Sequence, residues 1–271
     1  MEKHDFKKLK RKEAGPVEGS FIKEIIGRTN DYMIYIDENN NLLWSTNDNV
    51  NIFDGFGYIR NQVTNLELIV NRLFKSKEAF EFKVILGCVL NRIASDHNKD
   101  EVEDALNSAK ELITKQGCEN LKQSYIYSTV ISTLIVILLI AAILLFKNFT
   151  IDILGKSNYE ILIVSLFGGI GSFIFTNIRL SKYKPDINLN METHILDGCL
   201  RIFFGVMSGL FVILGIKANL IFGFIDKYDS RFFAEAFVCI VAGASDILIP
   251  NIIKQVEHKN IDAQPKTSIG N

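Results

Sequence analysis

The sequence predicts a mainly α-helical membrane protein: a four-helix transmembrane bundle preceded by a small cytosolic helical domain that contains one β-hairpin. An uncharged run from Ser124 to Phe146 lies in the middle of the 271-residue chain. At about 1.5 Å of rise per residue, this run can cross the hydrocarbon core of a bilayer, which is about 30 Å thick. Three more apolar segments follow it, whereas the part of the chain before it holds most of the charges. The net charge of -1 conceals this segregation.

The charged N-terminal part is expected to form the cytosolic domain. Residues 1–20 mix basic and acidic side chains and end in Gly-Pro and Gly-Ser breakers, which is typical of a disordered basic arm. Residues 21–123 then form an α-rich sensing or interaction domain. Two β-prone runs around an Asn-rich turn predict a hairpin over residues 32–45. Helical spacing of apolar residues predicts helices over 61–75, 77–95 and 100–115, and the polar stretch 116–123 is expected to be a hinge.

The apolar segments predict a membrane domain over residues 124–253. Its four spans cover residues 124–146, 161–178, 202–222 and 232–250, and residues 254–271 form a cytosolic tail. The last two segments are short or interrupted by charge, so a re-entrant hairpin is the alternative to two full crossings.

Basic residues near the span ends predict the orientation. Ten lie on the side of both termini and five on the other side. Together with a composition rich in Asn, Lys and Ile, this count predicts a multi-pass protein of the bacterial inner membrane whose N- and C-termini are both cytoplasmic.

Small residues recur at the spacing that lets membrane helices approach each other closely. They are Gly168, Gly169, Gly171 and Ser172 in the second span, Gly205 and Gly209 in the third, and Gly243 in the fourth. We interpret them as faces on which spans two to four pack, with subunit contact or pore lining as the sharper alternative. The first span has no such motif and is expected on the outside of the bundle, facing lipid.

The fourth span carries two acidic residues, Glu235 and Asp246. An unpaired carboxylate in a membrane is costly, so each needs a partner or water. Asp246 is expected to pair with Arg179 or Arg201, which end the second span and open the third. Glu235 has two basic residues at its own level, Lys217 and Arg231. The alternative is that both acids line an aqueous path for cations or protons.

Nothing in the sequence predicts an enzyme, a cofactor or a metal site. It has no nucleophile elbow, zinc-protease motif or phosphate-binding loop, and no nucleic-acid-binding signature. The four cysteines are scattered without a CxxC and are expected to be free thiols or small buried side chains. Glu192, His194 and Asp197 are expected in a cytoplasmic loop, where a lone histidine is weak evidence for a metal.

From about Lys83 to Ile253 the layout resembles a set of uncharacterised bacterial four-span proteins. Their pattern is a Gly-Gly-x-x-Gly-[AS] span ending in Arg, a Gly-x-x-Arg-x-x-x-Gly segment, and a last span with Ala-Gly-x-Ser-[ED]-x-x-x-Pro. The counterparts here are Gly168-Gly-Ile-Gly-Ser172 with Arg179, Gly198-Cys-Leu-Arg201 with Gly205, and Ala242-Gly-Ala-Ser-Asp-Ile-Leu-Ile-Pro250. The first has one residue fewer between its glycines than the pattern, and Asp246 stands where Glu is usual. This resemblance implies no known activity.

The layout is also similar to that of membrane effectors of bacterial anti-phage systems. That similarity implies a cytosolic module that senses a signal or partner and alters the membrane domain, permeabilising the membrane in antiviral defence. The alternatives are a small ion channel or transporter with an acidic path on the fourth span, and a passive membrane anchor for a complex. The expected partners are membrane lipid and either a second copy of the chain, in a homo-oligomer, or a cytosolic protein; nucleic acid is not expected.

Overall fold

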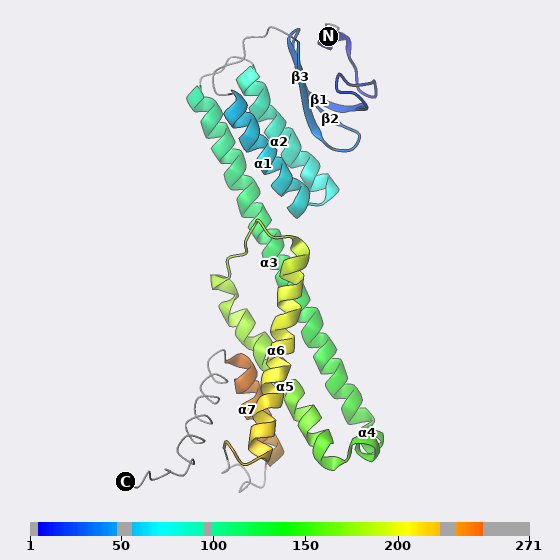
Figure 1. Cartoon of the computed structure of the whole chain (residues 1–271), viewed down its shortest axis with the longest axis vertical. Coiled ribbons are helices and arrows are strands. Elements are labelled where there is room, and N and C mark those ends of the chain that lie inside the picture. The colour runs from blue at the N-terminus through cyan, green and yellow to red at the C-terminus, as the bar shows by residue number, and fades with distance from the viewer. Residues whose placement is uncertain (1–4, 48–55, 95–98, 223–230, 246–271) are drawn as a thin grey trace, which may run out of the picture. The chain divides into compact units, whose positions relative to one another are not determined.

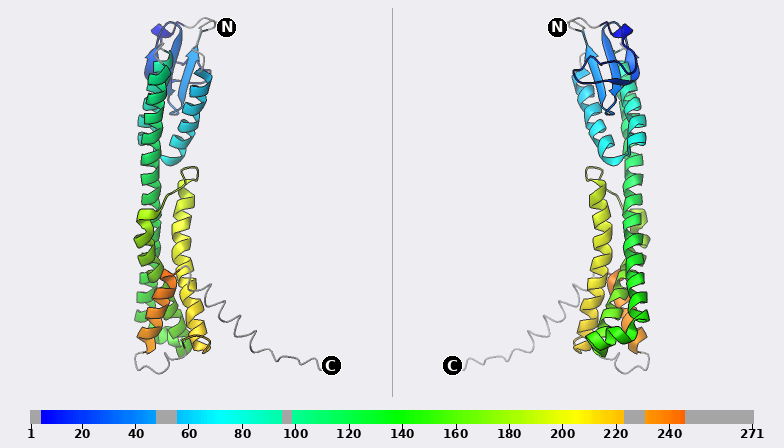
Figure 2. Two further views of the ribbon diagram at one scale, coloured as in Figure 1. Left: turned by 90° about the vertical axis from the view of Figure 1, so that its left-hand side faces the viewer. Right: turned by 90° about the vertical axis from the view of Figure 1, so that its right-hand side faces the viewer.

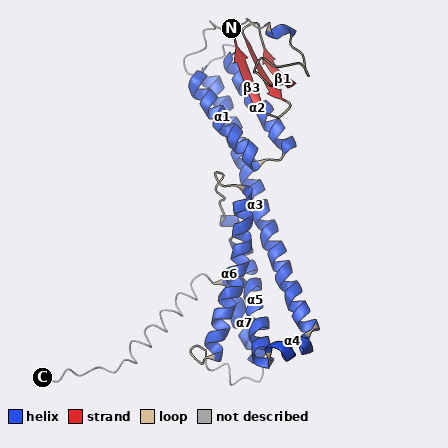
Figure 3. Ribbon diagram, turned by 45° about the vertical axis from the view of Figure 1, so that its right-hand side comes forward, coloured by secondary structure: helices blue, strands red, loops and turns tan. Residues whose placement is uncertain are grey.

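The computed structural model describes residues 5–47, 56–94, 99–222 and 231–245. They form two compact units (Figure 1). The first comprises Met1–Lys122 with Pro185–Met191, and the second comprises Gln123–Lys184 with Glu192–Asn271. The expectation of a mainly helical chain is confirmed: within the described ranges, the strands lie near the N-terminus and helices make up nearly all of the rest (Figure 3).

The strands of the first unit form one antiparallel sheet in the order β1-β2-β3. β2 (Tyr32–Asp37) and β3 (Leu42–Thr46) lie where the sequence predicts a hairpin. β1 (Ile22–Arg28) was not predicted, because two register shifts interrupt its pairing with β2 and blur the alternation that identifies a strand. The sheet therefore has three strands, and its central strand is buried along its whole length.

The expectation that residues 1–20 form a disordered arm is wrong for the described residues 5–20. A short 3₁₀ helix, η1 (Phe6–Lys8), places Phe6 in a small core with Ile22, Met33 and Tyr35 of the sheet. Phe6 is fully buried. One aromatic side chain in a charged segment thus buries enough apolar surface to hold the segment on the sheet.

Three helices complete the first unit. α1 (Phe56–Leu73), α2 (Ser76–Ala94) and the N-terminal part of α3 (Lys99–Leu145) share one core, to which Val70, Leu86 and Ile113 contribute. The expected hinge over 116–123 is wrong, since α3 continues through it. Leu121 stays in register with the apolar face of α3 and is fully buried, while Gly117 lets the helix approach Leu73.

The second unit consists of the C-terminal part of α3 with α4 (Lys147–Leu154), α5 (Lys156–Arg179), η2 (Leu180–Lys182), α6 (Met191–Lys217) and α7 (Arg231–Ala244). Among the described residues, three helical segments are long and apolar enough to cross a membrane: Asp100–Leu145, Lys156–Lys182 and Met191–Lys217. The chain is therefore membrane-spanning by the length and composition of these helices. In α3, 28% of the most apolar stretch is buried, whereas the corresponding share in α5 is 50%. The lower share is expected for a helix that faces lipid.

The prediction of a four-span bundle is corrected to three membrane-length helices in the described part of the chain. α7 has 14 residues, about 21 Å of helix, which is shorter than the hydrocarbon core. The predicted fourth span also included residues 246–250, and the predicted tail covered 254–271; both lie outside the described residues.

One further correction concerns the start of the third span. α6 begins at Met191 and not near residue 202, so Glu192, His194 and Asp197 lie on a helix and not in a loop. Its first turns are polar, and the apolar run on which the prediction rested begins later. The segment after the first span forms α4, which ends at Leu154 and is followed by Gly155, whose φ of +80° favours glycine.

Candidate functional site

In the second unit, α5, α6 and α7 lie close together (Figure 2). Small residues form the junction between them. A Cβ on Gly209 of α6 would lie 2.5 Å from the backbone oxygen of Ser165 of α5. A Cβ on Gly205 would lie 2.8 Å from the backbone oxygen of Gly168. The two helices therefore touch backbone to backbone, which only glycine permits.

α7 joins the same junction from its own small residues. A Cβ on Gly243 would overlap the backbone of Gly168, and a Cβ on Gly171 would overlap the backbone of Ile240. Cys239 of α7 donates a hydrogen bond from Sγ to the backbone oxygen of Gly209, at 3.4 Å. Gly168 thus faces α6 and α7 at once, so we regard it as the centre of the junction.

Two remaining members of the predicted packing set fix neighbouring contacts. Gly169 faces α6 and α3, because its Cβ would lie 2.9 Å from Val206 and 3.4 Å from Val136. Ser172 is buried and donates a hydrogen bond to the backbone oxygen of Arg201, at 2.8 Å. The small residues therefore pack helices of one chain together, which is the interpretation that the sequence favoured.

Glu235 lies at one end of this bundle in a chain of four charged side chains. Its side chain is 2% exposed and its Oε1 lies 3.2 Å from Nζ of Lys217 and 2.8 Å from Nε of Arg231. Lys217 also lies 3.2 Å from Glu160. Both of the basic residues expected at the level of Glu235 are therefore its partners. Within the described residues, Lys217 thus lies between two carboxylates and Glu235 between two cations.

The other charged end lies at Arg179 and Arg201. On α5, Glu160 and Arg179 are 19 residues apart, which corresponds to about 28 Å of helix. On α6, Arg201 and Lys217 are 16 residues apart, or about 24 Å. The two ends thus bound an apolar layer close to the thickness of a bilayer core.

Arg179 and Arg201 share an aromatic neighbour at this second end. The guanidinium carbons lie 4.1 Å and 5.8 Å from the ring centroid of Phe175. Asp246, their sequence-predicted partner, lies outside the described residues, so that ion pair stays a prediction. Sequence reasoning found the two arginines because each directly borders an apolar run.

Sequence reasoning missed the aromatic residues that lie beside these arginines. Tyr125 of α3 stacks on Tyr183, with ring centroids 4.5 Å apart and an interplanar angle of 18°. The hydroxyl of Tyr183 lies 2.8 Å from Nδ1 of His194, which is buried. Burial, followed by the charge of Asp197 and the neighbouring Tyr125, raises the pKa of Tyr183 to about 12. Tyr183 is therefore a neutral phenol at physiological pH.

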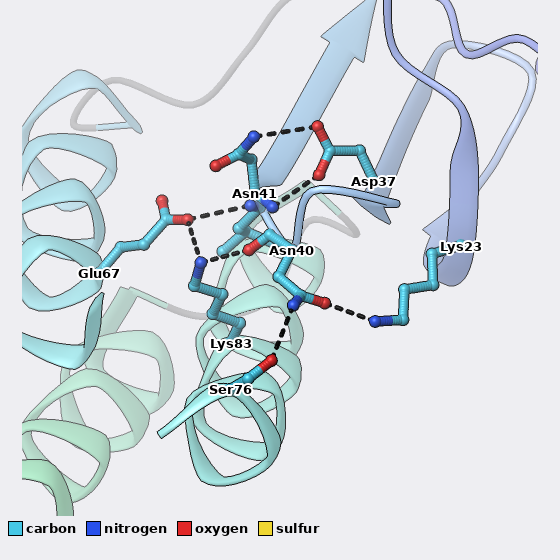
Figure 4. Close-up of polar contacts among 8 residues, drawn as sticks. Lys23, Asp37, Asn40, Asn41, Glu67, Ser76 and Lys83 are labelled. Carbon is cyan, nitrogen blue, oxygen red and sulfur yellow. Dashed lines mark hydrogen bonds and ion pairs between the residues drawn. The ribbon is translucent and has the colours of Figure 1, made fainter. Parts of the chain in front are cut away.

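In the first unit, the predicted Asn-rich turn between β2 and β3 carries a polar cluster (Figure 4). Lys83 of α2 is 2% exposed, lies 3.4 Å from Glu67 of α1, and donates to the backbone oxygen of Asn40. Glu67 also accepts a hydrogen bond from the backbone nitrogen of Leu42, at 2.9 Å. The cluster fastens the turn to α1 and α2, and a lysine on the apolar face of α2 was its only sequence signal.

Beside this cluster, β3, α1 and α2 enclose a cavity of about 270 Å³. Trp44 of β3 and Arg60 of α1 line it, and the Arg60 guanidinium carbon lies 4.7 Å from the Trp44 ring centroid. Val63 and Leu90 supply apolar lining. A cavity whose lining is about equally polar and apolar, with charged side chains at its wall, is suited to binding a small ligand or a side chain of a partner.

No group of three metal-ligating side chains occurs within residues 5–47, 56–94, 99–222 and 231–245. The cysteines are free thiols, of which Cys239 is buried and Cys88 and Cys199 are exposed. Comparison with protein-family models, with curated proteins and with solved structures finds no match to this chain.

Proposed function

We propose that this protein is a membrane effector, in which the first unit recognises a signal or a partner protein and the helical second unit responds within the membrane. The observation that carries the proposal is the continuity of α3. Its N-terminal part places Ile113 and Leu121 in the core of the first unit, and its C-terminal part places Val136 and Ile140 in the core of the second. A shift or rotation of this helix in the core of the first unit would therefore also move the residues that it places in the core of the second unit.

The first unit has the features that recognition requires. The cavity beside Trp44 and Arg60 offers a surface of mixed polarity, with an aromatic ring and charged side chains at its wall. The second unit has the features of a membrane-embedded bundle that can repack, because backbone contacts at Gly168 depend on a narrow range of helix positions. We place the protein in a bacterial inner membrane with the first unit in the cytoplasm, and its response is to permeabilise that membrane, as in anti-phage defence.

Conduction along an acidic path is the less supported alternative. Such a path needs a carboxylate that faces water, whereas Glu235 is buried between two cations. A carboxylate held in that way stabilises the bundle and offers no separate site to a passing cation.

Insertions at the boundary of the two units test the proposal. Seven alanines placed between Lys122 and Gln123 add about 700° of helix and almost restore the original phase, whereas two alanines rotate the following part by about 200°. We expect the wild-type chain and the seven-residue variant to depolarise expressing cells, measured with a potential-sensitive dye. The two-residue variant should insert normally and leave the membrane potential unchanged.

The contrary outcomes are distinct. Equal depolarisation by both insertion variants would show that α3 does not carry the signal. Absence of depolarisation by the wild-type chain, at expression levels verified by immunoblot, would favour a passive anchor.

A further inference from the structure

The cavity beside Trp44 in the first unit has a cation in its wall. Arg60 lies on α1 and lines this cavity. Within the ranges that the structure describes, Arg60 takes part in no ion pair, and no hydrogen bond uses its guanidinium group. Thr64, another lining residue, already donates its hydroxyl to the backbone oxygen of Arg60, at 3.0 Å. The donors that Arg60 offers to a ligand are therefore its guanidinium N–H groups.

The ring of Trp44 positions this cation before a ligand arrives. The guanidinium carbon of Arg60 lies 4.7 Å from the ring centroid, a distance at which a cation is attracted to the face of an aromatic ring. A donor that is already positioned loses less entropy on binding than a mobile side chain does. The wall of the cavity thus presents a cation with a preferred position.

The acidic residue of the lining does not neutralise Arg60. Glu67 follows Arg60 on α1 by about 10 Å of helix. Its carboxylate already lies 3.4 Å from Nζ of Lys83 and accepts a hydrogen bond from the backbone nitrogen of Leu42, at 2.9 Å. Because Lys83 balances Glu67, the cavity keeps the single positive charge of Arg60. One positive charge suits a carboxylate better than a phosphate group, which carries about 1.5 to 2 negative charges at neutral pH.

The apolar part of the lining, apart from Trp44, is aliphatic. It includes Leu42 of β3, Val63 of α1 and Leu90 of α2. The cavity volume of about 270 Å³ is slightly below the range of about 300–1,000 Å³ that is typical of small-molecule sites. The cavity therefore has room for one small aliphatic group beside the guanidinium of Arg60.

We propose that this cavity binds a carboxylate carried on a small aliphatic group, in the form of a free organic acid. The carboxylate accepts two parallel hydrogen bonds from the guanidinium of Arg60, and the aliphatic group packs against Val63 and Leu90. The small volume favours a free acid over the end of a protein chain. The proposal rests on the recognition role proposed above for the first unit and names the chemical class of its signal.

The test is a titration of the purified full-length chain, in detergent, with N-acetyl-leucine, followed by the fluorescence of Trp44. Trp44 is the single tryptophan of the chain and lies in the cavity wall, so its signal reports on this cavity. We expect a saturable change. N-acetyl-leucinamide, which has the same aliphatic group and no carboxylate, should bind about tenfold more weakly or worse, because the charge-assisted hydrogen bonds are missing. Equal affinity for the acid and the amide would overturn the proposal.

Variants of Arg60 assign the preference for the acid to its guanidinium group. Arg60→Gln should bind the acid and the amide with affinities within about twofold of each other, whereas Arg60→Lys keeps the charge and should retain part of the preference. The control, Arg92→Gln, removes an exposed arginine outside the cavity lining and should retain all of it. An unchanged preference in Arg60→Gln would overturn the proposal. Because Arg60→Lys keeps the cation over the ring, it keeps the test decisive if Arg60→Gln does not fold.

A longer probe identifies the source of the carboxylate. We expect an N-acetylated pentapeptide of four alanines and a C-terminal leucine to bind no more tightly than N-acetyl-leucine. Tighter binding of the peptide would overturn the assignment to a free acid and identify the C-terminus of a partner protein as the ligand.

The fluorescence titration does not depend on the membrane response. Depolarisation of cells by a chain that does not bind the acid would overturn the proposed ligand and leave the effector role in place. Binding of the acid by a chain that does not depolarise cells would overturn the effector role and support the proposed ligand.

Discussion

At the scale of single residues, the second unit depends on positions where a side chain is absent. Gly168 contacts the backbones of α6 and α7. The three helices can approach this closely because residue 168 has no side chain. In lipid, where burial of apolar surface gives little drive for helices to associate, such backbone contact is a main source of stability. The junction therefore brings the helices together, and the charged ends bound the apolar layer between them.

Gly168→Ala should destabilise the second unit by about 1–3 kcal/mol, because the new methyl group overlaps the carbonyl of Gly205 and has no free space nearby. Thermal unfolding in detergent measures the effect. Gly57→Ala is the matched control, since a Cβ there meets nothing within 4 Å and the change should be neutral or slightly stabilising. Equal melting temperatures for the two variants would show that the close contacts of Gly168 do not stabilise the second unit.

Glu235→Gln should cost about 3 kcal/mol, because it leaves the cations around a buried position without their shared carboxylate. Glu160→Gln should cost much less, since Glu160 is 35% exposed and Lys217 keeps Glu235. Coupling between Lys217→Gln and Glu235→Gln in a double-mutant cycle gives the strength of the pair. A Glu235→Gln protein of unchanged stability that has lost ion flux would instead support a conducting path.

At the scale of elements, apolar runs were the most informative part of the sequence and irregular segments the least. The cores of α1, α2, α3, α5 and α6 follow from hydrophobic spacing, but the start of α6 does not, since its first turns are polar. Of the span expected after Arg231, the described residues form the helix α7 (Arg231–Ala244). β1 and the segment around Phe6 were missed for a common reason: their order comes from packing on a neighbouring strand, which no local pattern records.

The residues of the candidate site likewise fall into those that the sequence identified and those that it did not. Arg179, Arg201 and the glycines were found because charge and small residues stand out against an apolar background. Tyr125, Tyr183 and Lys83 were not found, because their roles depend on partners that lie far away in the sequence.

Phe6→Ala tests the order of the N-terminal segment. Loss of this fully buried ring should destabilise the first unit by about 3–5 kcal/mol. The chain has a single tryptophan, Trp44, which lies on β3, so its fluorescence during urea unfolding reports on this unit. Lys10→Ala, at an exposed position of the same segment, should have almost no effect. An equally small loss of stability for Phe6→Ala and Lys10→Ala would contradict the packing of this segment on the sheet and would indicate a disordered arm.

At the scale of the whole molecule, one helix, α3, contributes to the core of the first unit, an antiparallel sheet with helices, and to the core of the helical second unit. The three membrane-length helices and the two charged ends support this division. We expect the chain around Asn148 to lie on one side of the membrane, and the first unit and the chain around Lys184 to lie on the other.

The most direct measurement is the labelling of single cysteines in intact cells with a membrane-impermeant maleimide, in a chain whose Cys88, Cys118 and Cys199 are replaced by alanine. We predict that Asn148→Cys is labelled in intact cells, whereas Lys184→Cys and Lys10→Cys are labelled only after the membrane is permeabilised. These three positions are all exposed in the structure, so burial does not limit the reaction. The same labelling of Asn148→Cys and Lys184→Cys in intact cells would contradict the crossing of α5 and, with it, the membrane-spanning bundle.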